Sequence, residues 1–354
     1  MSSEDLEGIL DRASEGRGIS KEDMTALLSL EDDLEKEMLF STAADLTRKN
    51  FGNKVSLYGF VYFSTYCRNN CTFCYYRRSN NKLRYRKNLE EIVSLSGGLQ
   101  DSGVNLVDLT MGEDPSMRSN GYKRLFRVIE EVDKAVSVPI MLSPGAVHKG
   151  VFPALKEAGV DWFACYQETY NRELFGNLRI EQDFDHRLNQ KLWARESGML
   201  AEDGMMVGIH ESLYDRVEAI SKMGETGCEQ IRVMTFVPQE GTPLFGAGGG
   251  TEEELKIISV MRLAHPDRLI PASLDVEGTE GLIPRLKAGA NVVTSIVPPN
   301  TNLAGVAQKD LDIDNGHRSV RYVFDLLDSA GYKASSNQDY SSMMRKMRER
   351  GMTV

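Results

Sequence analysis

The chain has 354 residues, of which 27% are charged, and its formal net charge is −10 at neutral pH. Its length suits one large α/β domain, and its acidity disfavours a nucleic-acid partner, which would usually meet a basic face. It contains no apolar run long enough to span a membrane, and the acidic segment Met1–Asp5 does not resemble a signal peptide. We therefore expect a cytoplasmic protein without a membrane partner.

Residues 1–50 are predicted to form a helical extension. Ser20, with Asp23 three positions later, has the pattern of a helix N-cap with a capping box. The leucines from Leu27 to Leu46 follow at roughly helical spacing. We expect this extension to pack on the outside or at the bottom of the domain that follows.

From residue 51 to about 335, short apolar runs alternate with amphipathic stretches of helix length. Such alternation predicts a parallel sheet, and eight strand-then-helix units in this length predict a closed (β/α)8 barrel of the TIM type. An open doubly wound sheet is the alternative. The predicted strands are Ser56–Phe63, Leu106–Met111, Pro139–Leu142, Trp162–Gln167, Met205–Ile209, Gln230–Phe236, Leu269–Leu274 and Asn291–Val297.

Residues 336–354 are predicted as a C-terminal helical tail. Its methionines, Met343, Met344 and Met347, fit a lid, a partner surface or plain core packing. The loops that follow the eight strands carry many Gly, Pro and polar residues. In a barrel of this kind the functional site is built from those loops, so we expect it at the carboxyl ends of the strands.

Three of the five cysteines lie in the loop after the first predicted strand. Cys67, Cys71 and Cys74 have the spacing C-x3-C-x2-C. The odd total and the clustering argue against disulfides and favour a metal site. Three thiolates are one fewer than a closed zinc site or a four-iron cluster needs. A structural zinc site would require a distant fourth ligand, because the next histidine or cysteine downstream is His148.

The cysteine loop resembles that of the radical S-adenosylmethionine (SAM) superfamily, in which three cysteines in C-x3-C-x-Φ-C hold a [4Fe–4S] cluster. Phe73 occupies the aromatic position. The resemblance implies that SAM binds the fourth iron, and that reduction of the cluster yields methionine and a 5′-deoxyadenosyl radical. It also assigns the cofactor contacts: Tyr76 through its backbone, Gly112 and Glu113 in a partial match to a Gly-Gly-Glu turn, Ser143, Glu168, Arg187, and Gly208 with Ile209 on the fifth strand.

The whole chain resembles the branch that contains biotin synthase, a hydrogenase maturase and the methylornithine synthase family. The stretches 57–71 and 106–114 carry the likeness to the last of these. That likeness implies isomerisation of L-lysine to (3R)-3-methyl-D-ornithine, the first step of pyrrolysine biosynthesis, by hydrogen abstraction, chain fragmentation and recombination. It also implies an electron donor such as flavodoxin or ferredoxin. The alternatives are a maturase-type radical enzyme acting on another small amino acid and a non-catalytic metal-binding barrel.

Polar residues inside the predicted strands fit an amino-acid substrate with two ammonium groups. Alternate residues of a strand share a face, so a polar residue within an apolar strand points into the barrel. Two carboxylates would hold ammonium groups and one arginine a carboxylate, whereas an internal Arg–Asp network is the structural alternative. The predicted substrate contacts are Asp108, Arg232, Ser273, Asp275 and Ser295. Cys165 and Cys228 are predicted core thiols, too few for the second cluster of biotin synthase.

Overall fold

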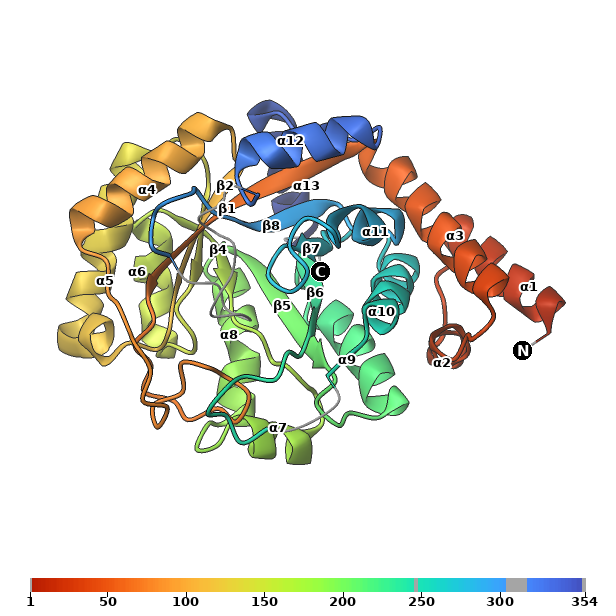
Figure 1. Ribbon diagram of the computed structural model, residues 1–354, viewed down its shortest axis with the longest axis horizontal. Coiled ribbons are helices and arrows are strands. Elements are labelled where there is room, and N and C mark those ends of the chain that lie inside the picture. The colour runs from red at the N-terminus through yellow and green to blue at the C-terminus, as the bar shows by residue number, and fades with distance from the viewer. Residues whose placement is uncertain (1, 245–247, 304–316, 352–354) are drawn as a thin grey trace.

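The computed structural model describes residues 2–244, 248–303 and 317–351, and within them eight parallel strands form a nearly closed barrel. The strand order is β6-β5-β4-β3-β2-β1-β8-β7, and a bridge between Gln230 and Leu269 joins β6 to β7. The predicted barrel is confirmed, and helices surround it in Figure 1. The strands are β1 Lys54–Ser64, β2 Leu106–Met111, β3 Ile140–Ser143, β4 Val160–Ala164, β5 Leu200–Val207, β6 Gln230–Thr235, β7 Pro271–Ser273 and β8 Val292–Ile296.

The fifth strand differs most from its prediction, because it begins at Leu200 and the prediction began it at Met205. Its first half contains Glu202 and Asp203, whose charges are typical of a loop. Both side chains are completely buried, and each forms an ion pair, with Arg232 and Lys191 respectively. Paired charges of this kind are tolerated inside a protein, so the strand continues through them.

Helices follow the strands around the barrel, as predicted. A short additional helix, α7, follows β4 and was not predicted. The helices from the first to the last strand are α4 Leu89–Ser102, α5 Pro115–Ala135, η1 Lys149–Val151 with α6 Phe152–Glu157, α7 Arg172–Leu178, α8 Phe184–Glu196, α9 Leu213–Glu225, α10 Thr251–Ala264 and α11 Leu282–Lys287; α12 Val320–Ser329 comes after β8.

The N-terminal helices lie on the outside of the barrel (Figure 1). They are α1 Ser3–Ser14, α2 Lys21–Leu28 and α3 Asp33–Phe51, and they pack against α9 and α10. Ser20 caps α2 and forms the predicted capping box with Asp23. The division into an extension, a barrel and a tail stays a prediction.

The C-terminal helix α13, Asn337–Gly351, packs at the end of the barrel where the strands begin. The preceding strand β9, Lys333–Ala334, pairs with the start of β1. The Tyr340 hydroxyl lies 2.7 Å from that of Tyr58, and Met344 and Met347 are buried beside it. The tail therefore provides core packing, one of the three roles that its sequence allowed. No described helix is long and apolar enough to cross a membrane.

Candidate active site

A cavity of about 270 Å³ opens where the barrel strands end, and it collects most of the predicted site residues. Tyr76, Gly208 and Ile209 do not line it. The residues that do are Cys67, Cys71, Phe73, Cys74, Asp108, Gly112, Glu113, Ser143, Glu168, Arg187, Arg232, Ser273, Asp275 and Ser295. The cavity therefore brings together the three thiols, the acids, the arginines and the serines that the sequence spreads over 229 positions, from 67 to 295.

The three predicted residues that do not line the cavity, Tyr76, Gly208 and Ile209, are engaged elsewhere in the fold. The carbonyl of Tyr76 accepts a hydrogen bond from Arg84 at 2.9 Å. Gly208 has φ +82°, and an added Cβ would lie 2.0 Å from the amide nitrogen of Gly249, so the position needs glycine for packing. Ile209 is completely buried in an apolar cluster. Their predicted backbone contacts with the cofactor remain predictions.

The side chain of Arg84 holds the cysteine loop in place. Arg84 donates hydrogen bonds to four carbonyl oxygens of the loop, which fixes its path between β1 and α4. Burial raises the pKa of the Cys67 thiol, and it raises that of Cys74 to about 12. These thiols are therefore protonated at neutral pH without a metal. Since a thiol that coordinates a metal is deprotonated, metal binding here would release protons.

Gly112 lets the end of β2 approach the cysteine loop. Its N–H donates to the Ser64 carbonyl at 2.8 Å. A Cβ at this position would lie 2.3 Å from the Tyr66 carbonyl oxygen and 3.0 Å from the Cβ of Cys67. Because the nearest atom belongs to the backbone, a side chain here would have to displace the loop that carries the first cysteine.

We therefore expect Gly112→Ala to impair assembly of the metal centre. The displaced loop should lower the iron bound per chain by about half or more, since ligand positions must match the metal's geometry within a few tenths of an ångström. Iron content after anaerobic reconstitution measures this effect. Gly98→Ala, on an exposed face of α4 with open space around it, is the matched control. Equal iron content in the two variants would contradict the prediction.

Glu113 lies among three arginines. Arg68 Nε is 2.9 Å from its carboxylate, and guanidinium nitrogens of Arg118 and Arg187 are each 3.8 Å away. Burial raises the pKa of Glu113, but Arg187, Arg118, the Ala146 N–H and Arg68 together more than offset this, so the pKa lies below its ordinary value. Three guanidinium groups around one carboxylate leave a local excess of positive charge, which favours an anionic ligand such as a carboxylate.

Glu168 is a buried carboxylate with one oxygen engaged and one unsatisfied. Arg179 forms an ion pair with Oε1, whereas Oε2 has no hydrogen-bond partner among the described residues. The backbone of Glu168 has φ +68°, a left-handed conformation that costs energy outside glycine. Because buried acceptors are rarely left unpaired and Glu168 lines the cavity, this oxygen is a candidate acceptor for a ligand's N–H or O–H group.

Deeper in the barrel, the predicted substrate contacts are already joined to partners that the sequence did not reveal. The Nε of Arg232 lies 2.5 Å from Glu202, and its guanidinium stands over the ring of Tyr166. Arg318 forms an ion pair with Asp275 at 3.0 Å. The structural alternative, an internal Arg–acid network, is thus present among the residues predicted to bind substrate.

The hydroxyl groups of the cavity complete this network. Ser295 donates to Asp275 at 2.9 Å, and Ser273 accepts from the Asp275 N–H at 3.2 Å. Asp108 accepts from Thr110 at 2.9 Å and from Ser143 at 3.1 Å. Ser143, predicted to contact the cofactor, thus bonds in this structure to Asp108, one of the predicted substrate contacts.

The charges of the deeper network do not cancel. Asp108, Glu202 and Asp275 contribute −3, and Arg232 and Arg318 contribute +2, which leaves −1 when all five are ionised. Asp108 lies deep in the protein but keeps some exposure to the cavity. Burial, followed by repulsion from Glu202, raises the pKa of Asp108 to about 7. The five groups are neutral overall while Asp108 is protonated, so the cavity floor favours a cationic ligand once Asp108 has ionised.

The sequence of this chain is similar to those of known proteins. The profile of the Radical SAM superfamily matches residues 61–223. A 3-methylornithine synthase from Methanosarcina barkeri is 41% identical over 97% of this chain and 98% of its own length. The chain belongs to the radical SAM superfamily, within the family of the 3-methylornithine synthases. The [FeFe] hydrogenase maturase subunit HydE from Thermotoga maritima is 32% identical over 79% of this chain and 80% of its own.

A solved structure agrees with this membership. The crystal structure of methylornithine synthase superposes with a TM-score of 0.90 at 41% identity, covering 95% of this chain and 99% of that one. Proteins of the radical SAM superfamily are enzymes that use a [4Fe–4S] cluster and SAM, and this member does the same. It is a radical SAM isomerase.

The residues of the cavity fit both the [4Fe–4S] cluster and SAM. Its upper part offers three thiols on one loop, an unsatisfied buried acceptor on Glu168 and an excess of arginine beside Glu113. Among the described residues, no three His, Cys, Asp or Glu side chains converge tightly enough for a single metal ion. Three thiols that line one cavity but stand apart suit a cluster, in which each binds a different iron, better than the zinc alternative.

Four functional candidates were missed by sequence reasoning: Glu202, Arg318, Arg179 and Gln182. Glu202 could have been found from strand alternation, because it lies two residues before Gly204 and therefore shares a face of β5 with it. Arg318 follows β8 at a distance and carried no such signal. Arg179 and Gln182 lie just after the unpredicted helix α7.

Proposed function

We propose that this enzyme isomerises L-lysine to (3R)-3-methyl-D-ornithine, the reaction of its family and the first step of pyrrolysine biosynthesis. The observation that carries the assignment is the cavity floor, where Asp108, Asp275 and Arg232 line the cavity. With their ion-pair partners Glu202 and Arg318 they carry a net charge of −1 once Asp108 is ionised. Lysine carries two ammonium groups and one carboxylate, so its net charge of +1 complements that floor.

The upper residues would hold the cofactors. Cys67, Cys71 and Cys74 would supply the thiolates for three irons of the cluster, and SAM would bind the fourth. Arg187 would bind the carboxylate of SAM, and Glu168 Oε2 would accept a hydrogen bond from it. When bound and reduced, these groups supply a radical that removes a hydrogen atom from the substrate.

The lower residues would orient lysine. Arg232 uses its Nε for Glu202, and a guanidinium has further N–H groups that could bind the substrate carboxylate. Asp108 and Asp275 would hold the two ammonium groups, with Ser273 and Ser295 fixing Asp275. Because these side chains come from barrel strands or positions just beyond them, and α13 packs the far end, the substrate would be held rigidly and away from water.

A comparison of the affinities for lysine and for norleucine tests the substrate assignment. Norleucine keeps the α-amino and carboxylate groups but replaces the side-chain ammonium with a methyl group. In the SAM-loaded, unreduced enzyme, calorimetry should show lysine binding at least about tenfold more tightly, the effect of one well-placed charged hydrogen bond. Equal affinity for the two amino acids would overturn the assignment.

The affinity for lysine is expected to rise with pH around neutrality. A carboxylate with a pKa of about 7 is mostly protonated at pH 6 and mostly ionised at pH 8, and only the ionised form attracts an ammonium group strongly. The association constant should therefore increase about tenfold across this range. Calorimetry at both pH values measures it. Asp108→Asn should bind weakly and lose the pH dependence, whereas an unchanged profile in that variant would contradict the role of Asp108.

The same pKa shift predicts a fall in stability as pH rises. Since burial raises the pKa of Asp108 from 3.8 to about 7, the folded protein binds more protons than the unfolded one between these values. Its contribution to the free energy of unfolding therefore decreases from pH 4 to pH 7 and is constant above.

We further propose that an acidic electron carrier, such as flavodoxin or ferredoxin, supplies the electron near the cysteine loop. The segment 77–87 contains six basic residues and no acidic one, in a chain of net charge −10. Leu83 at its tip is 96% exposed. Four of the six are paired with acids: Arg78 with Glu181, Lys82 with Glu240, Arg86 with Asp114 and Lys87 with Glu91. Arg77 is buried, and Arg84 donates to backbone carbonyls. A segment with an excess of basic residues over the acids that pair with them, and with an exposed leucine, suits transient docking of an acidic partner.

A further inference from the structure

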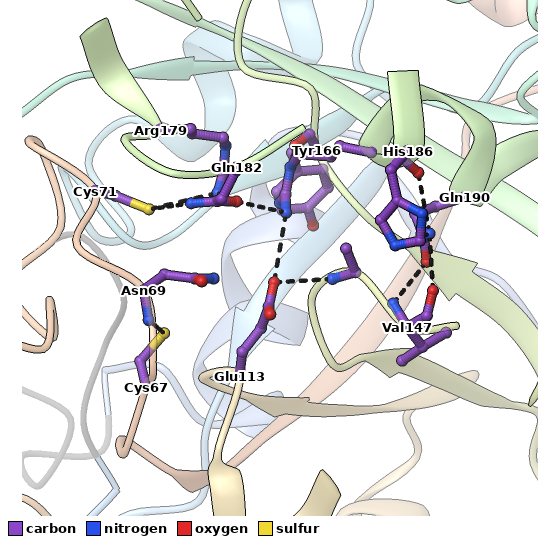
Figure 2. Close-up of polar contacts among 12 residues, drawn as sticks. Cys67, Asn69, Cys71, Glu113, Val147, Tyr166, Arg179, Gln182, His186 and Gln190 are labelled. Carbon is purple, nitrogen blue, oxygen red and sulfur yellow. Dashed lines mark hydrogen bonds and ion pairs between the residues drawn. The ribbon is translucent and has the colours of Figure 1, made fainter. Parts of the chain in front are cut away.

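Among the described residues, the sulfur of Cys71 differs from the other two cluster-loop sulfurs in that its donors are side chains. Gln182 Nε2 lies 3.1 Å from it and Arg179 Nη1 lies 3.6 Å from it, so two side chains point their N–H groups at one sulfur (Figure 2). Cys67 instead accepts from the backbone N–H of Asn69 at 3.4 Å, and Cys74 accepts from the backbone N–H of Tyr76.

A network fixes both donors. Arg179 forms the ion pair with Glu168, stands over the ring of Phe73, and donates to Gln182 Oε1 at 3.4 Å. Arg187 also donates to that oxygen, at 3.5 Å. Because both arginines can only donate, the amide oxygen of Gln182 must face them. Its NH₂ group is thereby directed to the Cys71 sulfur.

We propose that Gln182 and Arg179 raise the reduction potential of the cluster through Cys71, which makes them tuning residues for the electron-transfer step. The inference rests on the proposed function, since it requires Cys71 to bind iron. Reduction adds negative charge to the cluster and its sulfurs, and N–H donors stabilise that charge. Hydrogen bonds to ligand sulfurs are among the factors that set the potential of iron–sulfur centres.

The two donors act by hydrogen bonding rather than by net charge. The charge of Arg179 is balanced by Glu168, and Gln182 is neutral. Replacing Gln182 with methionine keeps the length of the side chain and removes the donor. Replacing it with glutamate keeps the shape, removes the donor and adds a negative charge, so the effect should be larger. Arg179→Lys keeps the charge for Glu168 and loses the planar fork that reaches Cys71.

Potentiometric titration of the reconstituted protein, followed by the electron paramagnetic resonance of the reduced cluster, tests the inference. At the midpoint potential of the unaltered enzyme, the ratio of reduced to oxidised cluster should fall about tenfold in Gln182→Met, which corresponds to about 59 mV for one electron. Gln182→Glu should shift the midpoint further in the same direction, and Arg179→Lys should also lower it. The control is Arg172→Gln, which removes a surface guanidinium paired with Asp185.

The outcomes separate this inference from the proposed function. If Gln182→Met and Gln182→Glu bind about four irons and keep the midpoint of the Arg172→Gln control, the tuning role is overturned and the proposed function stands. If the unaltered chain binds no four-iron cluster, both are overturned. Graded negative shifts in the order Met then Glu, with iron content unchanged, support the inference.

Discussion

Replacement of Cys71 with alanine should abolish lysine isomerisation, with activity at least about a thousandfold below that of the unaltered enzyme. A four-iron cluster held by three thiolates loses a quarter of its ligands, counting SAM, when one is removed. Without the assembled cluster, the remaining residues have no means of generating a radical. Anaerobic reconstitution followed by iron analysis and product detection measures both effects, and Cys67→Ala and Cys74→Ala should behave alike.

Cys228→Ala is the matched control, because that thiol is completely buried in the apolar core away from the cavity. It should keep the iron content and activity of the unaltered enzyme. The cluster assignment would fail if Cys71→Ala retained about four irons per chain, or if the unaltered protein took up one zinc per chain in their place.

The second large effect is expected from Glu202→Gln. This substitution leaves the guanidinium of Arg232 buried without its counter-ion, and removing one partner of a buried ion pair typically costs about 3–5 kcal/mol. The free energy of unfolding, measured by urea denaturation, should fall accordingly. Because Arg232 also loses the group that holds it in place, kcat/KM for lysine should fall by about 30-fold or more.

A double-mutant cycle with Arg232→Met separates stability from function. The double variant removes both charges and should be more stable than Glu202→Gln alone, since no unpaired charge remains. Its activity should stay low, because the proposed carboxylate anchor is gone. Recovery of activity together with stability would show that the pair is purely structural and that another residue binds the substrate.

The fold was predictable because its signal repeats. Eight alternations of apolar runs and amphipathic stretches identified the barrel, and the β2 prediction, Leu106–Met111, agrees with the observed strand at both ends. The start of β5 was missed because Glu202 and Asp203 are charged. Their burial depends on Arg232 and Lys191, partners that only the folded chain brings beside them.

The site was predictable where its signal is local. The three cysteines lie within eight positions of one another, and the inward-facing Asp108 and Arg232 could be read from alternation in their strands. The pairing of Asp275 with Arg318 could not be, because 42 residues separate them and no periodic pattern links a strand end to a distant loop. For the same reason, the donors that reach Cys71 from beyond α7 emerged only from the structure.

One turnover experiment tests the proposed lysine isomerisation most directly. The reconstituted enzyme is incubated anaerobically with SAM, a chemical reductant and ¹³C-labelled L-lysine. The amino acids are then separated by chromatography and their masses are measured by mass spectrometry. We predict a labelled product with the mass of lysine and a different retention time, with more than one product molecule per SAM because the isomerisation is redox-neutral. Cleavage of SAM without any labelled isomer of lysine would contradict the account.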